Sequence, residues 1–179
     1  MTAADLAQRT AGLVRAGAAA AITGGALRIV STFIPYEANS PGLEALYGVI
    51  DLGLMFGLVA VYIASAEAVG IAGLALFLVA LAGAASIVGP DAPALGVDLY
   101  RIGALVFVAG LAGLSVQLLR AGVMRVSVGF WLATFAASLW TILVPQAFVV
   151  AGLAIGAGYV LAGAELLRTR PLSALAAAA

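Results

Sequence analysis

Cysteine, histidine and lysine are all absent from this chain, and its eight basic residues are arginines. Without cysteine there is no disulfide, thiolate nucleophile or sulfur-ligated metal. Without histidine there is no imidazole to bind zinc or haem or to act as an acid or base. Without lysine a Schiff base and the lysine of a phosphate-binding loop are also excluded. We therefore expect no cofactor and no metal site.

Charged residues are scarce as well. They make up 9% of the chain, against 65% hydrophobic residues, and the mean hydropathy is +1.21. The formal net charge is zero, and the arginines form no dense cluster, so the chain is not expected to bind nucleic acid. A composition this apolar needs lipid as its solvent. The sequence therefore predicts an all-α integral membrane protein whose main partner is the lipid bilayer.

The chain of 179 residues is long enough for several membrane-spanning helices. A bilayer core about 30 Å thick takes roughly 20 apolar residues per helix. We expect six spans, at residues 11–34, 43–66, 69–89, 97–119, 123–144 and 147–167. These spans make one membrane domain over residues 1–179, with no soluble domain left over. The Ala- and Leu-rich stretch 170–179 is expected to be a frayed tail.

Proline recurs at a constant interval of 55 residues, at Pro35, Pro90 and Pro145. A hydroxyl residue stands four positions before each proline, at Ser31, Ser86 and Thr141. Proline cannot continue the hydrogen bonding of a helix, and a nearby hydroxyl can bond a backbone carbonyl where no water is available. The interval predicts three helical hairpins, at about 11–66, 67–119 and 122–168.

The charges are distributed unevenly between the two ends of the expected spans. One side carries Arg9, Arg15, Arg120, Arg125, Arg168 and Arg170. The opposite loops carry Glu37, Glu44, Asp91 and Asp98, with only Arg101 nearby. Arginines near short loops stay on the cytoplasmic side, so we expect both termini in the cytoplasm. Arginine without lysine, together with much alanine and glycine, favours a GC-rich bacterial genome and hence a bacterial cytoplasmic (inner) membrane.

Two ionisable residues lie deep within the expected spans, Arg28 and Asp51. At 1.5 Å per residue, both fall roughly 10 Å below the outer rim, where they can meet across the first hairpin. Charges at such depth cost a few kcal/mol each and are normally placed against partners or a water-filled cavity. The structural alternative is an ion pair that fixes the register of this hairpin.

Further polar residues gather above this pair. Glu44, Tyr47 and Asp51 share one helical face, and Asp98 and Arg101 are three residues apart at the start of the fourth span. Tyr47 and Tyr100 also suit the role of interfacial anchors. The hypothesis is an outward-facing polar recess that binds a ligand through Arg28, Asp51, Glu44, Tyr47, Asp98 and Arg101.

The three hairpins differ where this recess is expected. In place of the first hairpin's charges, the other two carry small or apolar residues such as Gly83, Ser138 and Ala104. A site is therefore expected where the repeat is broken. Glycine pairs at close-packing spacing, Gly53 with Gly57 and Gly152 with Gly156, suit packing within the chain or against a second copy or another membrane protein.

Three functional hypotheses follow. The first is a non-enzymatic protein whose recess binds or passes a small or amphipathic ligand, such as a lipid, or which serves as an accessory subunit of a membrane complex. The second is a membrane-embedded enzyme of the isomerase or cyclase kind, with Asp51 or Glu44 as general acid and Arg28 stabilising an anionic substrate. The third is a purely structural bundle. The absence of a catalytic motif favours the first.

Overall fold

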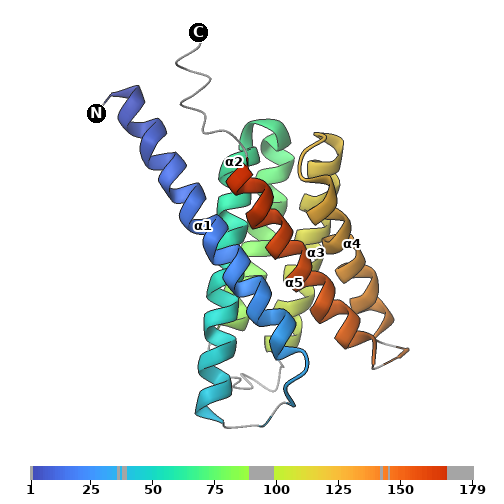
Figure 1. The fold of residues 1–179 in the computed structure, drawn as a ribbon. Coiled ribbons are helices and arrows are strands. Elements are labelled where there is room, and N and C mark those ends of the chain that lie inside the picture. Colours follow the sequence, from blue (N-terminus) through green and yellow to red (C-terminus); the bar gives the residue numbers. More distant parts are fainter. Residues whose placement is uncertain are drawn as a thin grey trace.

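The computed structural model describes residues 2–35, 37, 40–88, 99–141, 143, 144 and 146–168. In this part of the chain there are five helices, α1 (Ala3–Ser31), α2 (Pro41–Ile87), α3 (Leu99–Arg120), α4 (Arg125–Trp140) and α5 (Ala147–Arg168). They form a bundle in which α1 begins and α5 ends at the same end (Figure 1). Four of the described helices, α1, α2, α3 and α5, are long and apolar enough to cross a membrane. This supports the expected helical membrane protein.

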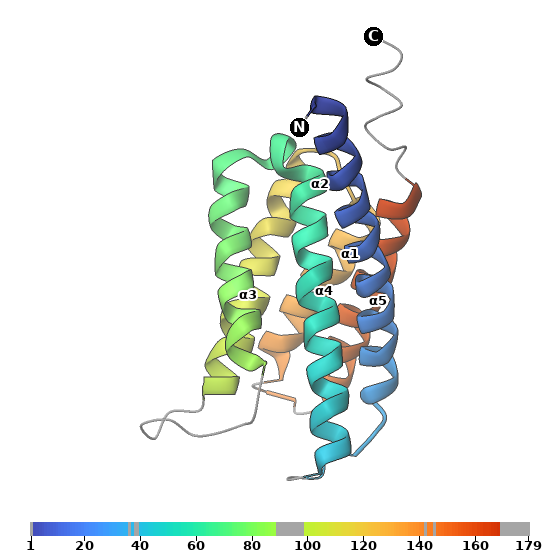
Figure 2. The same ribbon diagram turned by 90° about the vertical axis from the view of Figure 1, so that its left-hand side faces the viewer.

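The expectation of six separate helices differs from the structure at α2. This helix has 47 residues and would be about 70 Å long if straight, more than twice the thickness of a bilayer core. It is interrupted at Gly70, whose backbone has φ 58° and ψ −156°. There the chain reverses, so that 41–69 and 71–87 run side by side in opposite directions (Figure 1, Figure 2). A single glycine thus replaces the loop expected between the second and third spans.

The helix α4 is also shorter than expected. It has 16 residues, whereas the apolar segment from which we predicted it covers 123–144. It is therefore not among the four described helices that satisfy the length for a membrane crossing. Met124, with φ 53°, precedes its first turn, and the helix ends before Thr141.

The reversal at Gly70 gives a stability prediction. A Cβ at this position would meet no atom within 4 Å, so the cost of Gly70→Ala is the backbone strain of a conformation that L residues rarely adopt, about 1–3 kcal/mol. Gly48→Ala is the matched control, because Gly48 lies inside the same helix with equally open space and alanine favours helix. The unfolding temperature measured in detergent should be lower than that of the wild type for Gly70→Ala but not for Gly48→Ala. An equal response of both variants would contradict the strained turn.

The helices are neighbours in a closed order: α1 packs on α2, α2 on α3, α3 on α4, α4 on α5, and α5 on α1. Of these five seams, that between α3 and α4 is the least extensive. Between α4 and α5, Trp131 and Tyr159 are fully buried, with ring centroids 5.2 Å apart. Four of the five seams are therefore tight, and one is loose.

Glycines allow α1 and α2 to come into backbone contact. A Cβ added to Gly24 would lie 3.0 Å from the Cα of Gly53, and one added to Gly57 would lie 2.7 Å from the Cβ of Ala21. A side chain at any of these glycines would force the helices apart. The predicted pair Gly53 and Gly57 therefore packs against α1 of the same chain.

The seam between α1 and α5 is built in the same way. A Cβ added to Gly156 would lie 2.7 Å from the carbonyl oxygen of Gly25, and one added to Gly152 would lie 2.7 Å from Oγ1 of Thr32. Both predicted glycine pairs are thus used within the chain to hold α1. This position matters because α1 carries Arg28.

The three hydroxyl residues of the 55-residue pattern make equivalent hydrogen bonds. Ser31 Oγ donates to the carbonyl oxygen of Arg28 (3.0 Å). Ser86 Oγ donates to Gly83 (2.8 Å), and Thr141 Oγ1 donates to Ser138 (2.6 Å). Each hydroxyl donates to the carbonyl three residues earlier, near the C-terminal end of its helix. Pro35 follows the end of α1, while Pro90 and Pro145 lie outside the described residues.

Candidate functional site

A cavity of about 360 Å³ lies inside the bundle and is partly open to the exterior. All five described helices contribute to its wall. Its polar lining consists of Arg28 of α1, Asp51 of α2, Tyr100 and Arg101 of α3, and Thr134, Ser138 and Thr141 from α4 and its C-terminal cap. The remaining lining is apolar. The volume is at the lower end of the range for small-molecule sites.

The glycine seams explain why Arg28 and Asp51 reach the same cavity. Gly24 contacts Gly53, and the two helices run in opposite directions (Figure 1). Arg28 comes one turn after Gly24, and Asp51 comes two residues before Gly53. Their Cα atoms therefore differ in height by only about 3 Å, in agreement with the equal depth predicted from the sequence.

The two side chains do not form the ion pair that the structural hypothesis requires. Both are half-buried, and Arg28 is near enough to interact electrostatically with Asp51. Among the described residues, however, neither the Arg28 nor the Asp51 side chain makes an ion pair within 4.0 Å or a hydrogen bond. The bundle is also not packed solid at this point. A guanidinium and a carboxylate therefore share a cavity without being joined directly.

Two threonine hydroxyls of the cavity wall already donate their hydrogens to backbone carbonyls. Thr134 Oγ1 donates to the carbonyl oxygen of Phe130 (2.9 Å), and Thr141 Oγ1 donates to Ser138. Because each hydroxyl hydrogen is used within α4 or its cap, only the oxygen lone pairs remain for another group. Thr134 and Thr141 therefore offer hydrogen-bond acceptors to the cavity.

The other residues of the predicted site divide into three groups. Arg101 lines the cavity together with Arg28 and Asp51. Glu44 does not, because it lies in the first turn of α2, about 10 Å along the helix axis from Asp51, and is exposed. Tyr47 also lies outside the lining and packs against the hydrophobic core. Asp98 falls outside the described residues.

The sequence did not identify Tyr100, Thr134 or Phe148 as cavity residues. Tyr100 was expected to be an interfacial anchor. Ser138, which lies two 55-residue intervals after Arg28, does line the cavity, so the break in the repeat pointed to the correct region. Nothing in the sequence marks Phe148, since its position depends on how α5 packs against the other helices.

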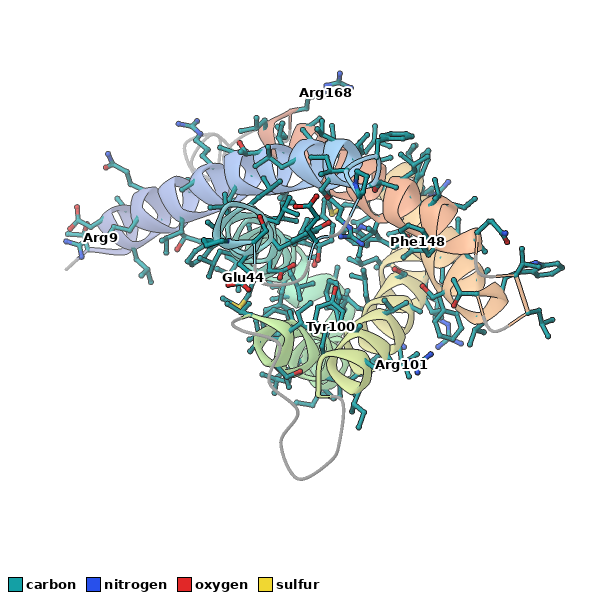
Figure 3. The ribbon with its side chains drawn as sticks, turned by 90° about the horizontal axis from the view of Figure 1, so that it is seen from below. Arg9, Glu44, Tyr100, Arg101, Phe148 and Arg168 are labelled. Carbon is teal, nitrogen blue, oxygen red and sulfur yellow. The ribbon has the colours of Figure 1, made fainter. Side chains whose placement is uncertain are left out.

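Figure 3 views the end of the bundle at which α2, α3 and α5 begin. Glu44 from α2, Tyr100 and Arg101 from α3, and Phe148 from α5 lie around this end, whereas Arg9 and Arg168 lie at the outer edge of the view. Since Tyr100, Arg101 and Phe148 line the cavity, the cavity extends toward this end. It therefore lies away from the end at which α1 begins and α5 ends.

The chain was compared with protein-family models, with curated proteins and with solved structures. No match was found in any of the three. The chemistry of the cavity is therefore the basis for assigning a function.

Proposed function

We propose that this chain is a non-enzymatic membrane protein whose central cavity binds or passes a small or amphipathic ligand. The observation that carries the proposal is the presence of Arg28 and Asp51 in one cavity without direct contact between them. Each charge costs a few kcal/mol inside a membrane unless water or a partner compensates it. A ligand with groups complementary to both residues supplies that compensation.

We also propose that the chain crosses a bacterial inner membrane six times, as three hairpins with both termini in the cytoplasm. The reversal of α2 at Gly70 supports two crossings by this helix, and the return of α5 to the end at which α1 begins supports an even number (Figure 1). The arginine distribution supports a cytoplasmic location for that end. In this arrangement the cavity opens toward the outer side.

The enzymatic alternative has less support. It requires Asp51 or Glu44 as general acid, and Glu44 does not line the cavity. Within the described wall, Asp51 is the carboxylate, while Thr134 and Thr141 donate their hydroxyl hydrogens to backbone carbonyls. The described lining therefore suits recognition better than catalysis.

Ligand-dependent thermal unfolding tests the proposal. The purified protein is heated in detergent with a panel of polar solutes and lipids, and at least one of them should raise the unfolding temperature of the wild type. Arg28→Ala and Asp51→Asn should lose this response, since a hydrogen bond to a charged group contributes about 1.5–3 kcal/mol. Arg9→Ala, at an exposed position outside the cavity, is the control. The proposal fails if the two cavity variants respond as the control does.

A further inference from the structure

The cavity has an apolar side opening between α3 and α4. Leu105 of α3 and Leu139 of α4 both line the cavity, yet 56% of the Leu105 surface and 49% of the Leu139 surface are exposed. A residue that touches both the cavity and the exterior lies at its edge. Phe148, 55% exposed in the first turn of α5, marks the edge at the end of the bundle, and the two leucines mark the edge on α3 and α4. The seam between these two helices is also the least extensive of the five between neighbouring helices.

Helical geometry indicates on which side of α4 this edge lies. Successive residues of a helix are about 100° apart, so Ala137 and Leu139 lie on opposite flanks of Ser138, which lines the cavity. Ala137 lines a separate apolar groove formed with Ala147 and Val150 of α5. Its flank therefore faces α5. Leu139 consequently lies on the flank toward α3.

The glycine contacts agree with this assignment. Close backbone approach through glycine occurs between α1 and α2, α1 and α5, and α2 and α3, where Gly110 packs on Ala80. Between α4 and α5, Gly158 packs on Trp131. Among the described glycines, none makes such a contact between α3 and α4. Of the five seams, the one between α3 and α4 is thus the one at which no described glycine packs against the neighbouring helix.

The cavity chemistry restricts the polar group that it can receive. Arg28 and Arg101 suit an anionic group, while Asp51 and the acceptor oxygens of Thr134 and Thr141 suit a cationic group or another donor. A head group that carries both charges matches both walls at once. The cavity volume of about 360 Å³ holds such a head group but not long acyl chains as well, so the chains of a lipid must leave through an apolar opening.

We infer that the ligand is a membrane amphiphile with a zwitterionic head group, which enters from the bilayer between α3 and α4. The head group lies between Arg28 and Asp51, and the acyl chains pass Leu105 and Leu139 into the surrounding lipid. This inference rests on the proposed function. It adds the class of ligand and the route of entry.

Three probes separate the inference from the proposed function. Phosphatidylethanolamine has the zwitterionic head and the chains, glycerophosphoethanolamine has the head alone, and phosphatidylglycerol has the chains with an anionic head. Binding to the full-length protein in detergent is measured by native mass spectrometry and by thermal shift. We expect phosphatidylethanolamine to bind at least about tenfold more tightly than the other two, and Arg28→Ala to remove this preference.

Each of the other outcomes excludes a specific part of this inference: the route of entry, the head group or the binding itself. Equal binding of glycerophosphoethanolamine and phosphatidylethanolamine excludes the lateral route and leaves the proposed function standing. Tighter binding of phosphatidylglycerol excludes the zwitterionic head group. If none of these probes and no member of the solute panel binds, the proposed function fails together with the inference.

Variants at the opening test the route directly. Leu139→Trp and, independently, Leu105→Trp should slow the exchange of bound phosphatidylethanolamine by about tenfold, because a bulkier side chain obstructs the gap. Both leucines are largely exposed, so the substitutions leave the core intact. Leu78→Trp, at a leucine of α2 that is 51% exposed and outside the cavity, is the control. If lipid exchange is the same in all three variants, the route is wrong.

Discussion

Gly25→Ala is expected to lower the unfolding temperature by about 5–10 °C, a large effect for one methyl group. The added Cβ would lie 2.6 Å from the carbonyl oxygen of Gly156 and 3.0 Å from the backbone nitrogen of Val160. Backbone atoms cannot rotate away as a side chain can, so α1 and α5 must separate. Overpacking of this kind costs about 1–3 kcal/mol or more.

The same helix provides the control for this substitution. Gly12 has no atom within 4 Å of an added Cβ, so Gly12→Ala should leave stability unchanged or raise it slightly through helix propensity, by up to about 1 kcal/mol. The intrinsic fluorescence of the buried Trp131 reports the unfolding of both variants. Equal unfolding temperatures for Gly25→Ala and Gly12→Ala would show that α1 is not held by close backbone contact.

Reversal of the cavity charges should separate folding from binding. Arg28→Asp places two half-buried carboxylates in one cavity. It should lower the free energy of unfolding by on the order of 3 kcal/mol, the cost of an uncompensated charge in a membrane. The double variant R28D/D51R restores opposite charges and should regain most of this stability. It should not regain ligand binding, because each end of the ligand now meets a charge of its own sign.

The binding and structural hypotheses give opposite results for the double variant. If the two residues serve only each other, R28D/D51R behaves as the wild type in every assay. If they bind a ligand, its stability recovers while the ligand-dependent shift stays absent. Arg168→Asp, at an exposed residue near the end of α5, controls for a general effect of charge reversal and should leave both stability and the ligand response unchanged.

Local geometry explains what could be predicted from the sequence. The shared depth of Arg28 and Asp51 follows from counting residues along two helices, and the hydroxyl bonds of Ser31, Ser86 and Thr141 follow from the need of each hydroxyl for an acceptor where no water is available. The helical membrane character follows from composition. None of these features depends on which helices are neighbours around the bundle.

Long-range packing explains what could not be predicted. The chain contains 22 glycines, and no local feature marks Gly70 as the glycine at which α2 reverses its direction. The spacing of the glycine pairs in α2 and α5 predicted that another helix packs closely against each of them. It did not predict that α1 is the partner of both pairs. Glu44 shares a helical face with Asp51 yet lies beyond the cavity, since the depth of a cavity is set by all its walls.

A high-resolution density map of the protein, purified from a membrane that contains phosphatidylethanolamine, tests the central claim most directly. We expect elongated non-protein density whose polar end lies between Arg28 and Asp51 and whose apolar end passes between Leu105 and Leu139. A cavity closed by direct contact between the Arg28 guanidinium and the Asp51 carboxylate, with no room for other density, would contradict it.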